Sequence, residues 1–387
     1  MTSRPLTIAL PWHSLGHGNL GVDALTRANI AIIQAAAARI GREVRITTLC
    51  SSGQVTPETT PAGVTVGPLP RIKPLLRGKS DYLAVLRRSD LVIDIGEGDS
   101  WSDIYGNHRY AFHAGTKVAA LLLGKPLVLA PQTIGPFDNP KKRWLANRIM
   151  DRASAVFSRD NLSSQYLSRH KIKAKTAEFI DVAFRLPYDA QPRGVSPRPQ
   201  VGINVSGLLY RDAIGPRSMG MTLDYAALTH RLIEALEQRG ADVHLVPHVL
   251  EEGGLDDDHA FTPELTARFP QLKVPARFRS ASEAKSYMSG LDFVVGGRMH
   301  ACIGAFSSNT PVVPIAYSRK FNGLFGTLGY PHYVDGRAVD TNTALAAILT
   351  GFEQRAQLAE DIKPGLVLAK ERLDAYESEL AAIMAKL

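Results

Sequence analysis

Short apolar runs rich in Val, Ile and Leu alternate along this chain with amphipathic segments of helical length, and this alternation restricts the possible folds most. Continuous apolar runs are typical of buried parallel strands, and regular strand–helix alternation indicates βαβ units. The predicted strands are Thr7–Leu10, Val44–Leu49, Leu91–Ile95, Pro126–Ala130, Ala155–Ser158, Val201–Val205, Asp242–Pro247, Phe293–Gly296 and Pro311–Tyr317. The predicted helices between them are Val22–Ile40, His113–Leu123, Asp224–Arg239, Ser282–Ser289 and Met299–Ser307. We therefore expect an α/β fold with parallel sheets.

With 387 residues, the chain is longer than the size at which a single hydrophobic core stops growing. The stretch Gln191–Gln200 contains three prolines and almost no apolar side chains, which is typical of a linker. We predict two doubly wound, Rossmann-like domains facing a cleft, formed by residues 1–190 and residues 200–350. Residues 351–387 are predicted to form a C-terminal helix that packs back on the N-terminal domain.

The formal net charge of +8 has two interpretations. A positive field attracts anionic substrates or the anionic face of a membrane, but the same charge also serves solubility alone. The basic residues are scattered, without a block of five or more and without interleaved aromatic residues. We therefore do not expect nucleic acid to be a partner.

The N-terminal residues lack the charge and hydropathy pattern of a signal peptide, and no apolar stretch is long enough to span a membrane. The two cysteines, Cys50 and Cys302, fit a reducing compartment better than a disulfide framework. We expect a cytoplasmic protein. Peripheral association with the inner face of the cell membrane is an option that the positive charge leaves open.

One predicted strand ends at the sequence GGRMH, in which Gly297, Arg298 and His300 lead into a helix. Ligands bind open α/β sheets at the carboxyl ends of the strands, where helix N-termini and glycines present backbone N–H groups. Arginine suits a carboxylate or phosphate, and histidine can transfer a proton near neutral pH. The following strand, Pro311–Tyr317, leads to Lys320, which adds positive charge. The alternative is a tight turn with a surface arginine and a structural histidine.

Other motifs accompany GGRMH in a fixed order. They are Gly16–Ala24 (GHGNLGVDA), Pro131–Phe137 (PQTIGPF), Arg159–Leu167 (RDNLSSQYL), Asp181–Phe184 (DVAF), Pro247-His248 and Pro311–Lys320. Taken together, they make the chain resemble the polysaccharide pyruvyl transferase family over most of its length. The sequence departs from the family at Gly96–Trp101, which reads GEGDSW where members usually have a glycine-rich GGG turn. Its carboxylates, Glu97 and Asp99, change the local charge.

Several of these motif residues also have structural interpretations. Asn19 and Asp23 stand at the start of the first predicted helix, where they can cap the helix or contact a ligand. Asp160 fits an N-cap, which leaves Arg159 to reach an anion. His248 stands at the end of a predicted strand, where it would face the cleft.

The resemblance implies transfer of pyruvate from phosphoenolpyruvate to two hydroxyls of one sugar, forming a ketal and releasing phosphate. The acceptor would be a sugar of a polysaccharide or of its lipid-linked precursor. The family's fold is similar to that of the GT-B glycosyltransferases, with the acceptor expected on the N-terminal side and phosphoenolpyruvate on the C-terminal side.

Roles for individual residues follow from this resemblance. His300 is the expected general acid, and Asp23 or His248 the expected base. The residues expected to bind phosphoenolpyruvate are Arg298, Lys320, Arg159 and Gly297. The residues expected to bind the acceptor are Asn19, Glu97, Asp99 and Gln132, of which Gln132 also has a scaffolding interpretation. No cofactor besides the co-substrate phosphoenolpyruvate is expected, and no metal.

Two other functions stay open at this point. One is a GT-B glycosyltransferase that uses a nucleotide sugar. The other is a non-catalytic carbohydrate-binding or assembly protein on the same scaffold, although such a protein would not need to keep both Arg298 and His300. The sequence leaves the acceptor sugar and the oligomeric state undetermined.

Overall fold

The computed structural model describes residues 4–49, 55–70, 80–215 and 218–387. It divides the chain into two compact units. The first unit consists of Met1–His17, Leu25–Arg185 and Glu371–Leu387, and the second unit of Gly18–Ala24 and Leu186–Lys370. The helices α1 and α14 therefore contribute residues to both units.

The first unit contains a seven-stranded sheet in the order β3-β2-β1-β4-β5-β6-β7. Every neighbouring pair of strands is parallel, as expected for a doubly wound sheet. The strands are β1 (Leu6–Pro11), β2 (Val44–Leu49), β3 (Val64–Val66), β4 (Leu91–Asp94), β5 (Leu127–Gln132), β6 (Ala155–Ser158) and β7 (Lys175–Glu178). The helices are α1 (Leu20–Arg39), α3 (Asp81–Arg88), α4 (Asn107–Leu122), α5 (Pro140–Met150) and α6 (Asn161–Arg169), with 3-10 turns at Pro57–Thr59, Gly96–Gly98 and Val182–Arg185.

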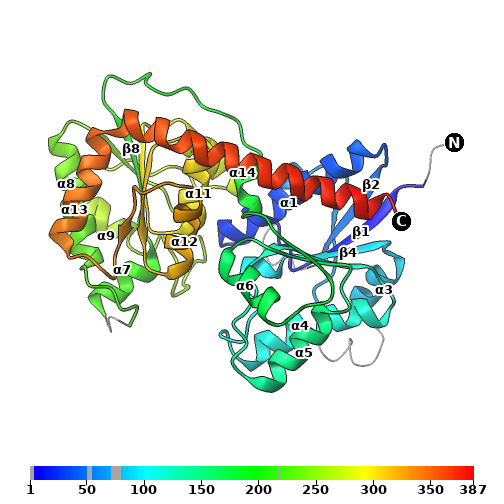
Figure 1. Cartoon of the computed structure of the whole chain (residues 1–387). Coiled ribbons are helices and arrows are strands. Elements are labelled where there is room, and N and C mark those ends of the chain that lie inside the picture. Colours follow the sequence, from blue (N-terminus) through cyan, green and yellow to red (C-terminus); the bar gives the residue numbers. More distant parts are fainter. Residues whose placement is uncertain (1–3, 50–54, 71–79, 216–217) are drawn as a thin grey trace. The chain divides into compact units, whose positions relative to one another are not determined.

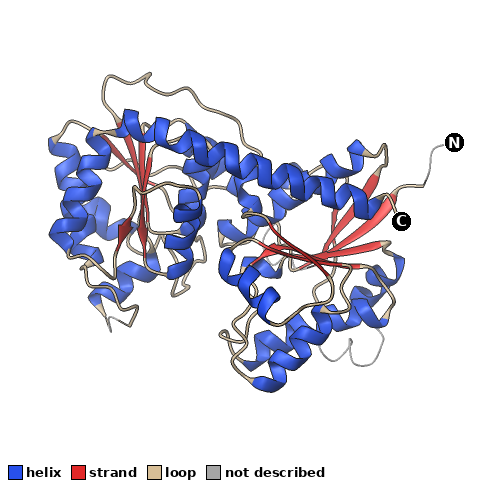
Figure 2. Cartoon of the chain, viewed as in Figure 1, coloured by secondary structure: helices blue, strands red, loops and turns tan. Residues whose placement is uncertain are grey.

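The second unit contains a five-stranded parallel sheet in the order β12-β11-β10-β8-β9. Its strands are β8 (Gln200–Asn204), β9 (Asp242–Leu245), β10 (Phe293–Gly296), β11 (Val312–Ala316) and β12 (Val334–Asp335). Its helices are α7 (Gly207–Ile214), α8 (Tyr225–Gln238), α9 (Thr262–Arg268), α10 (Ala281–Ser289), α11 (Met299–Ser307), α12 (Arg319–Thr327), α13 (Thr341–Glu353) and the first part of α14 (Arg355–Met384). Helices cover both faces of each sheet (Figures 1 and 2).

The predicted fold class is confirmed, because both units are parallel α/β sheets with helices on both faces. The central strands were predictable because they are buried on both faces and therefore apolar. The prediction missed the edge strands β3, β7 and β12. β7 reads KTAE and half of it is exposed, so its sequence carries no apolar signal. The chain passes from the first unit to the second between Arg185 and Leu186, just before the stretch predicted as a linker.

A buried chain of hydrogen bonds joins the end of α14 to β1 within the first unit. The Tyr376 hydroxyl donates to Asn29 Oδ1 (3.0 Å), and Asn29 Nδ2 donates to His13 Nε2 (2.8 Å). The other ring nitrogen, His13 Nδ1, donates to the Pro11 carbonyl oxygen (2.9 Å). This arrangement needs a neutral imidazole, because Nε2 must accept a hydrogen bond. Burial supplies that condition by lowering the pKa of His13 to about 4.

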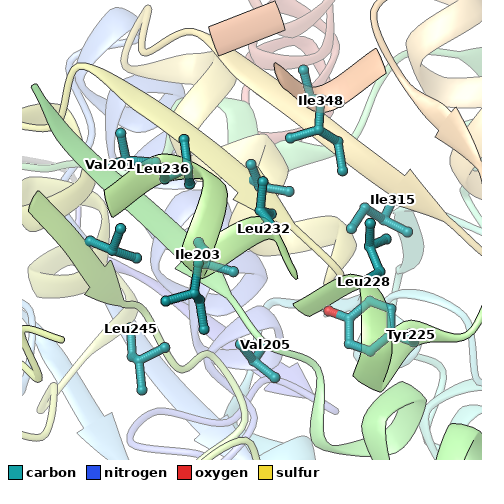
Figure 3. Close-up of a cluster of buried hydrophobic side chains, with 14 of the residues drawn as sticks. Val201, Ile203, Val205, Tyr225, Leu228, Leu232, Leu236, Leu245, Ile315 and Ile348 are labelled. Carbon is teal, nitrogen blue, oxygen red and sulfur yellow. The ribbon is translucent and has the colours of Figure 1, made fainter. Parts of the chain in front are cut away.

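A cluster of buried apolar side chains forms the core of the second unit between its sheet and α8. Figure 3 shows Leu232 of α8 near Ile203 of β8 and Ile315 of β11. The Leu232 side chain is packed on all sides, so nearly all of its apolar surface is removed from water. The core is therefore sensitive to the loss of this side chain.

We expect Leu232→Ala to lower the free energy of unfolding by about 2–5 kcal/mol, because it removes buried methyl groups and leaves a cavity. Urea titration followed by circular dichroism measures the change. The control is Leu255→Ala in the same unit, whose side chain is exposed and whose replacement should change stability by less than about 0.5 kcal/mol. Equal effects of the two substitutions would contradict the described core.

The neutral state of His13 makes stability depend on pH. Because the folded-state pKa lies below the ordinary value of 6.5, this histidine contributes stability above pH 6.5 and loses it as the pH falls toward 4. The full contribution corresponds to about 3 kcal/mol. We expect the stability difference between the wild type and His13→Gln to shrink over this range, as measured by urea titration at several pH values. Tyr376→Phe removes a non-titrating member of the chain, so its effect should not change with pH there.

Candidate functional site

The glycines of GGRMH are required by close packing at the end of β10. A Cβ atom on Gly296 would lie 2.4 Å from Cys302 Sγ, and one on Gly297 would lie 2.5 Å from the Tyr225 hydroxyl oxygen. The turn is held to β8 by two hydrogen bonds. Gly297 N donates to the Asn204 carbonyl oxygen (3.2 Å), and Arg298 N donates to Asn204 Oδ1 (2.9 Å). Arg298 therefore leaves the sheet in one defined direction.

The Arg298 side chain forms a buried ion pair with Asp258. Its Nε and Nη2 atoms lie 3.1 and 2.9 Å from Asp258 Oδ1, and Nη2 also donates to the Asp256 carbonyl oxygen (2.5 Å). The remaining nitrogen, Nη1, lies 3.7 Å from the carboxylate of Asp256. Arg298 is thus already charge-paired within its own unit.

Asp258 also organises the backbone around this ion pair. Its Oδ2 atom accepts hydrogen bonds from His248 N (2.9 Å), Val249 N (3.0 Å) and Asn204 Nδ2 (3.2 Å), and its Oδ1 atom accepts one from Gly207 N (2.9 Å). Sequence reasoning missed Asp258. The only available signal was the run of three aspartates that ends there, in a loop after the Pro247-His248 motif.

His248 is buried close to Arg298 and His300. Neither of its ring nitrogens has a hydrogen-bond partner among the described residues. Burial lowers the pKa of His248 to about 3, and the nearby charges of His300 and Arg298 act in the same direction. The ring is therefore neutral at physiological pH, and the structure has two histidines and an arginine in one small region.

The turn that precedes α1 packs against the same region. A Cβ atom on Gly21 would lie 2.4 Å from His300 Nδ1, so this glycine lets the backbone approach the histidine ring. Leu20 N donates to the His248 carbonyl oxygen (2.9 Å). Asn19 Oδ1 accepts from Gly21 N (2.9 Å), which is the helix-capping interaction that the sequence allowed.

Asp23 lies one turn further along α1 and is fully buried. Its Oδ2 atom accepts a hydrogen bond from Ala281 N (2.8 Å), the first residue of α10. The N-terminal segment Gly18–Ala24 is therefore part of the second unit. Seven of the predicted site residues belong to that unit: Asn19, Asp23, His248, Gly297, Arg298, His300 and Lys320.

A second group of predicted residues lies at the carboxyl ends of β4, β5 and β6 in the first unit. Glu97 is in the 3-10 turn after β4, in a left-handed conformation (φ 49°), and forms an ion pair with Arg109. Asp99 accepts a hydrogen bond from the Tyr105 hydroxyl (2.7 Å). Both carboxylates are thus tied to the segment that leads into α4.

Gln132 ends β5 and is fully buried. Its Nε2 atom donates to the carbonyl oxygens of Asp94 (2.9 Å) and Ala130 (3.2 Å), so it fastens β5 to β4. Asp94 is in turn paired with Lys117 of α4 (2.9 Å), and both side chains are fully buried. Sequence reasoning did not identify this ion pair, since nothing local marks Lys117, the one Lys or Arg of the predicted helix His113–Leu123, as a buried cation.

Arg159 differs from its predicted state. The sequence predicted that its side chain is free to reach an anion. In the structure, Nη1 lies 2.5 Å from Asp181 Oδ2, and Nε donates to Thr133 Oγ1 (3.1 Å). A buried arginine needs such a partner, which the neighbouring DVAF motif supplies. Asp160 caps α6 as predicted, because its side chain accepts from Ser163 N (2.8 Å).

The backbone of Lys320 is in the first turn of α12, but its side chain is outside the described part of the structure. Within the described ranges, no group of three or more His, Cys, Asp or Glu residues is arranged to hold a metal ion. In the same ranges, none of the helices combines the length and apolar character needed to cross a bilayer.

Comparison with known proteins gives a family match and a distant relative. A family model described as polysaccharide pyruvyl transferase matches residues 19–319. The amylovoran biosynthesis protein AmsJ of Erwinia amylovora is 24% identical over 263 residues, which cover 64% of this chain. The match spans 61% of the length of AmsJ, which is less than two thirds.

Solved structures with a similar fold include glycosyltransferases and a UDP-N-acetylglucosamine 2-epimerase. HepE of Anabaena, in complex with UDP-glucose, has a TM-score of 0.57 at 14% identity and covers 99% of this chain and 100% of its own. Sucrose-phosphate synthase of Thermosynechococcus elongatus has a TM-score of 0.54 at 13% identity, with 98% of each chain covered. At these identities the likeness shows the fold alone, and it agrees with the predicted GT-B-like class.

We expect Asp258→Ala to lower the free energy of unfolding by about 3–5 kcal/mol, because it leaves the buried Arg298 without its counter-ion. Asp256→Ala is the matched control: its side chain is 45% exposed and lies 3.7 Å from Arg298, and such pairs contribute at most about 1 kcal/mol. Chemical denaturation of both variants gives the comparison. Similar losses would show that the ion pair with Asp258 does not anchor the site.

Proposed function

The chain belongs to the polysaccharide pyruvyl transferase family, whose model matches residues 19–319, and from this we propose that it transfers a pyruvyl group from phosphoenolpyruvate to a sugar. The family match and the similarity to AmsJ support a role in polysaccharide biosynthesis. The proposed product is a ketal, formed with release of phosphate. The observation that supports the proposal most directly is the grouping of His300, His248 and Arg298 in the second unit.

Phosphoenolpyruvate carries a phosphate and a carboxylate, so its site needs several donors of positive charge. Helices α11 and α12 begin just after the adjacent strands β10 and β11, and their N-cap residues, Arg298 and Ser318, form no side-chain capping hydrogen bond. The first N–H groups of both helices are suited to hold an anion. We assign donor binding to these groups, with Gly297 allowing close approach and Arg298 Nη1 adding charge.

His300 fits the role of general acid. In the proposed reaction, it gives a proton to the methylene carbon of phosphoenolpyruvate, which leaves an oxocarbenium-like centre at the adjacent carbon. A sugar hydroxyl attacks that carbon and loses its proton to a base. The carbon–oxygen bond to phosphate then breaks, phosphate leaves, and the second hydroxyl attacks the same carbon and loses its proton. One phosphoenolpyruvate and one diol thus give one ketal and one phosphate.

The two base candidates differ in their surroundings. His248 has a pKa of about 3 because it is buried, so it is a weak base, and its neutral ring is better suited to orient a sugar hydroxyl. The hydrogen bond from Ala281 N holds the Asp23 carboxylate in place. We therefore assign proton removal to Asp23 and hydroxyl orientation to His248.

The other expected roles stay predictions. They are donor binding by Lys320 and Arg159, acceptor binding by Asn19, Glu97, Asp99 and Gln132, a cytoplasmic location, a glycan or lipid-linked acceptor, and a reaction that uses no metal or further cofactor. Addition of EDTA to the activity assay tests the metal, because a chelator-sensitive and metal-restored reaction would refute that part.

We expect phosphoenolpyruvate to raise the thermal unfolding midpoint, because a ligand that binds only the folded state stabilises it by about 2.7 kcal/mol at 100 times its dissociation constant. His300→Ala should keep this rise and lose the release of phosphate in the presence of a sugar acceptor. Differential scanning fluorimetry and a phosphate-release assay measure the two effects. His108→Ala, which replaces an exposed histidine of α4, should keep both.

UDP-glucose and GDP-mannose serve as comparison ligands in the same experiment. A rise in the midpoint with a nucleotide sugar, and none with phosphoenolpyruvate, would replace pyruvyl transfer by nucleotide-sugar glycosyl transfer. Wild-type phosphate release by His300→Ala would remove this histidine from the mechanism.

A further inference from the structure

We propose that the first unit docks on an anionic lipid surface through the outer faces of α4 and α5. We call this surface the α4–α5 face and define it by Ala111, Gly115, Val118 and Leu122 of α4 together with Lys141, Trp144, Arg148 and Arg152 of α5 and the turn after it. The two helices lie side by side on one face of the sheet (Figure 1). The proposed docking depends on the exposure and charge of these side chains and not on the proposed chemistry.

The outer face of α4 is apolar. Ala111, Gly115, Val118 and Leu122 are spaced by four, three and four residues, so they lie on one side of the helix. The opposite side contains the buried residues of α4 and packs against the sheet. Ala111 is exposed and Leu122 is 83% exposed, whereas Gly115 has no side chain and Val118 is half-buried and also packs against the core of the first unit. A solvent-facing helix usually has charged side chains at such positions, so this stripe is suited to an apolar environment.

The outer face of α5 combines an exposed tryptophan with cations. Lys141, Trp144, Arg148 and Arg152 are spaced by three, four and four residues and share one side of the helix. Trp144 is 63% exposed, and the Arg148 guanidinium lies 5.7 Å from the centre of its ring. Tryptophan and basic residues together are typical of the membrane–water interface.

The charge around the apolar stripe is positive on both sides. Neither α4 nor α5 contains an Asp or Glu residue. Beyond α4, α3 exposes Arg87 and Arg88, and Lys125 Nζ donates to the Arg87 carbonyl oxygen (2.7 Å), which joins the end of α4 to α3. Among residues 81–152, the exposed acids are Asp81 at the start of α3 and Asp138 before α5. Asp151, which follows α5, is half-buried and accepts a hydrogen bond from Lys173 N (2.9 Å). A cationic rim around an apolar stripe matches an anionic bilayer surface.

Other partners fit this face less well. A nucleic acid would match the cations but not the apolar stripe of α4. A second copy of the chain would bring two cationic rims together, and like charges across an interface oppose association. An anionic lipid surface satisfies both features, since the headgroups pair with the cations while Trp144 and Leu122 enter the interfacial layer.

Vesicle flotation of the full chain tests the proposal. The vesicles contain phosphatidylcholine alone or phosphatidylcholine with 30% phosphatidylglycerol. We expect binding to the anionic vesicles only, with a blue shift of tryptophan fluorescence that Trp144→Phe removes. Arg148→Glu/Arg152→Glu should weaken binding at least about tenfold, since each basic residue near an anionic leaflet contributes about fivefold. Leu122→Ser should weaken binding at equal net charge.

Two variants control for charge and apolar surface elsewhere. Arg279→Glu/Lys363→Glu changes the net charge equally at exposed positions of the second unit, and Leu162→Ser removes an apolar side chain that is 60% exposed on α6. Both should bind like the wild type. The proposal is overturned by absence of binding, by equal losses in the controls, or by self-association through this face in analytical ultracentrifugation. We expect all variants to keep the thermal unfolding midpoint of the wild type and its rise with phosphoenolpyruvate. This result would show that folding and donor binding are separate from docking.

Discussion

The buried ion pair between Arg298 and Asp258 is the interaction on which the candidate site depends. Removing two charges from water is unfavourable, and the mutual attraction offsets this only where the geometry is good and the other polar atoms are satisfied. Here the second carboxylate oxygen accepts two backbone N–H groups and the side-chain amide of Asn204. The pair therefore contributes more to position than to stability, because it fixes the end of β8, the turn after β10 and the backbone of His248 together.

This fixed arrangement explains the low pKa of His248. His248 lies beside His300 and Arg298, and burial together with their charges keeps its pKa at about 3. A bound phosphoenolpyruvate would add negative charge to the same region, and opposite charge favours the protonated form of a histidine. Under the proposed function, donor binding would therefore raise the pKa of His248 from this low value.

How well the sequence predicts an interaction depends on how far apart in the chain its residues lie. Gly297, Arg298 and His300 were predicted together because they lie within five consecutive residues. Asp258 was not, because it acts on a residue 40 positions away and nothing local separates it from Asp256 or Asp257. The same reason applies to Arg159, because its partner Asp181 is 22 positions away and the pairing depends on the fold. Edge strands such as β7 were missed because a strand with only one neighbouring strand is partly exposed and does not need an apolar sequence.

Helix α4 connects the turn that contains Glu97 to the α4–α5 face of the first unit. Near its start, Arg109 is paired with Glu97 in the turn at the carboxyl end of β4, and at its end Leu122 belongs to the α4–α5 face. The helix has 16 residues, which corresponds to a length of about 24 Å. Glu97, which is proposed to contact the acceptor, and the α4–α5 face, which is proposed to contact the lipid surface, are thus connected by one helix of this length. If the acceptor is lipid-linked, docking and acceptor binding become two functions of one helix.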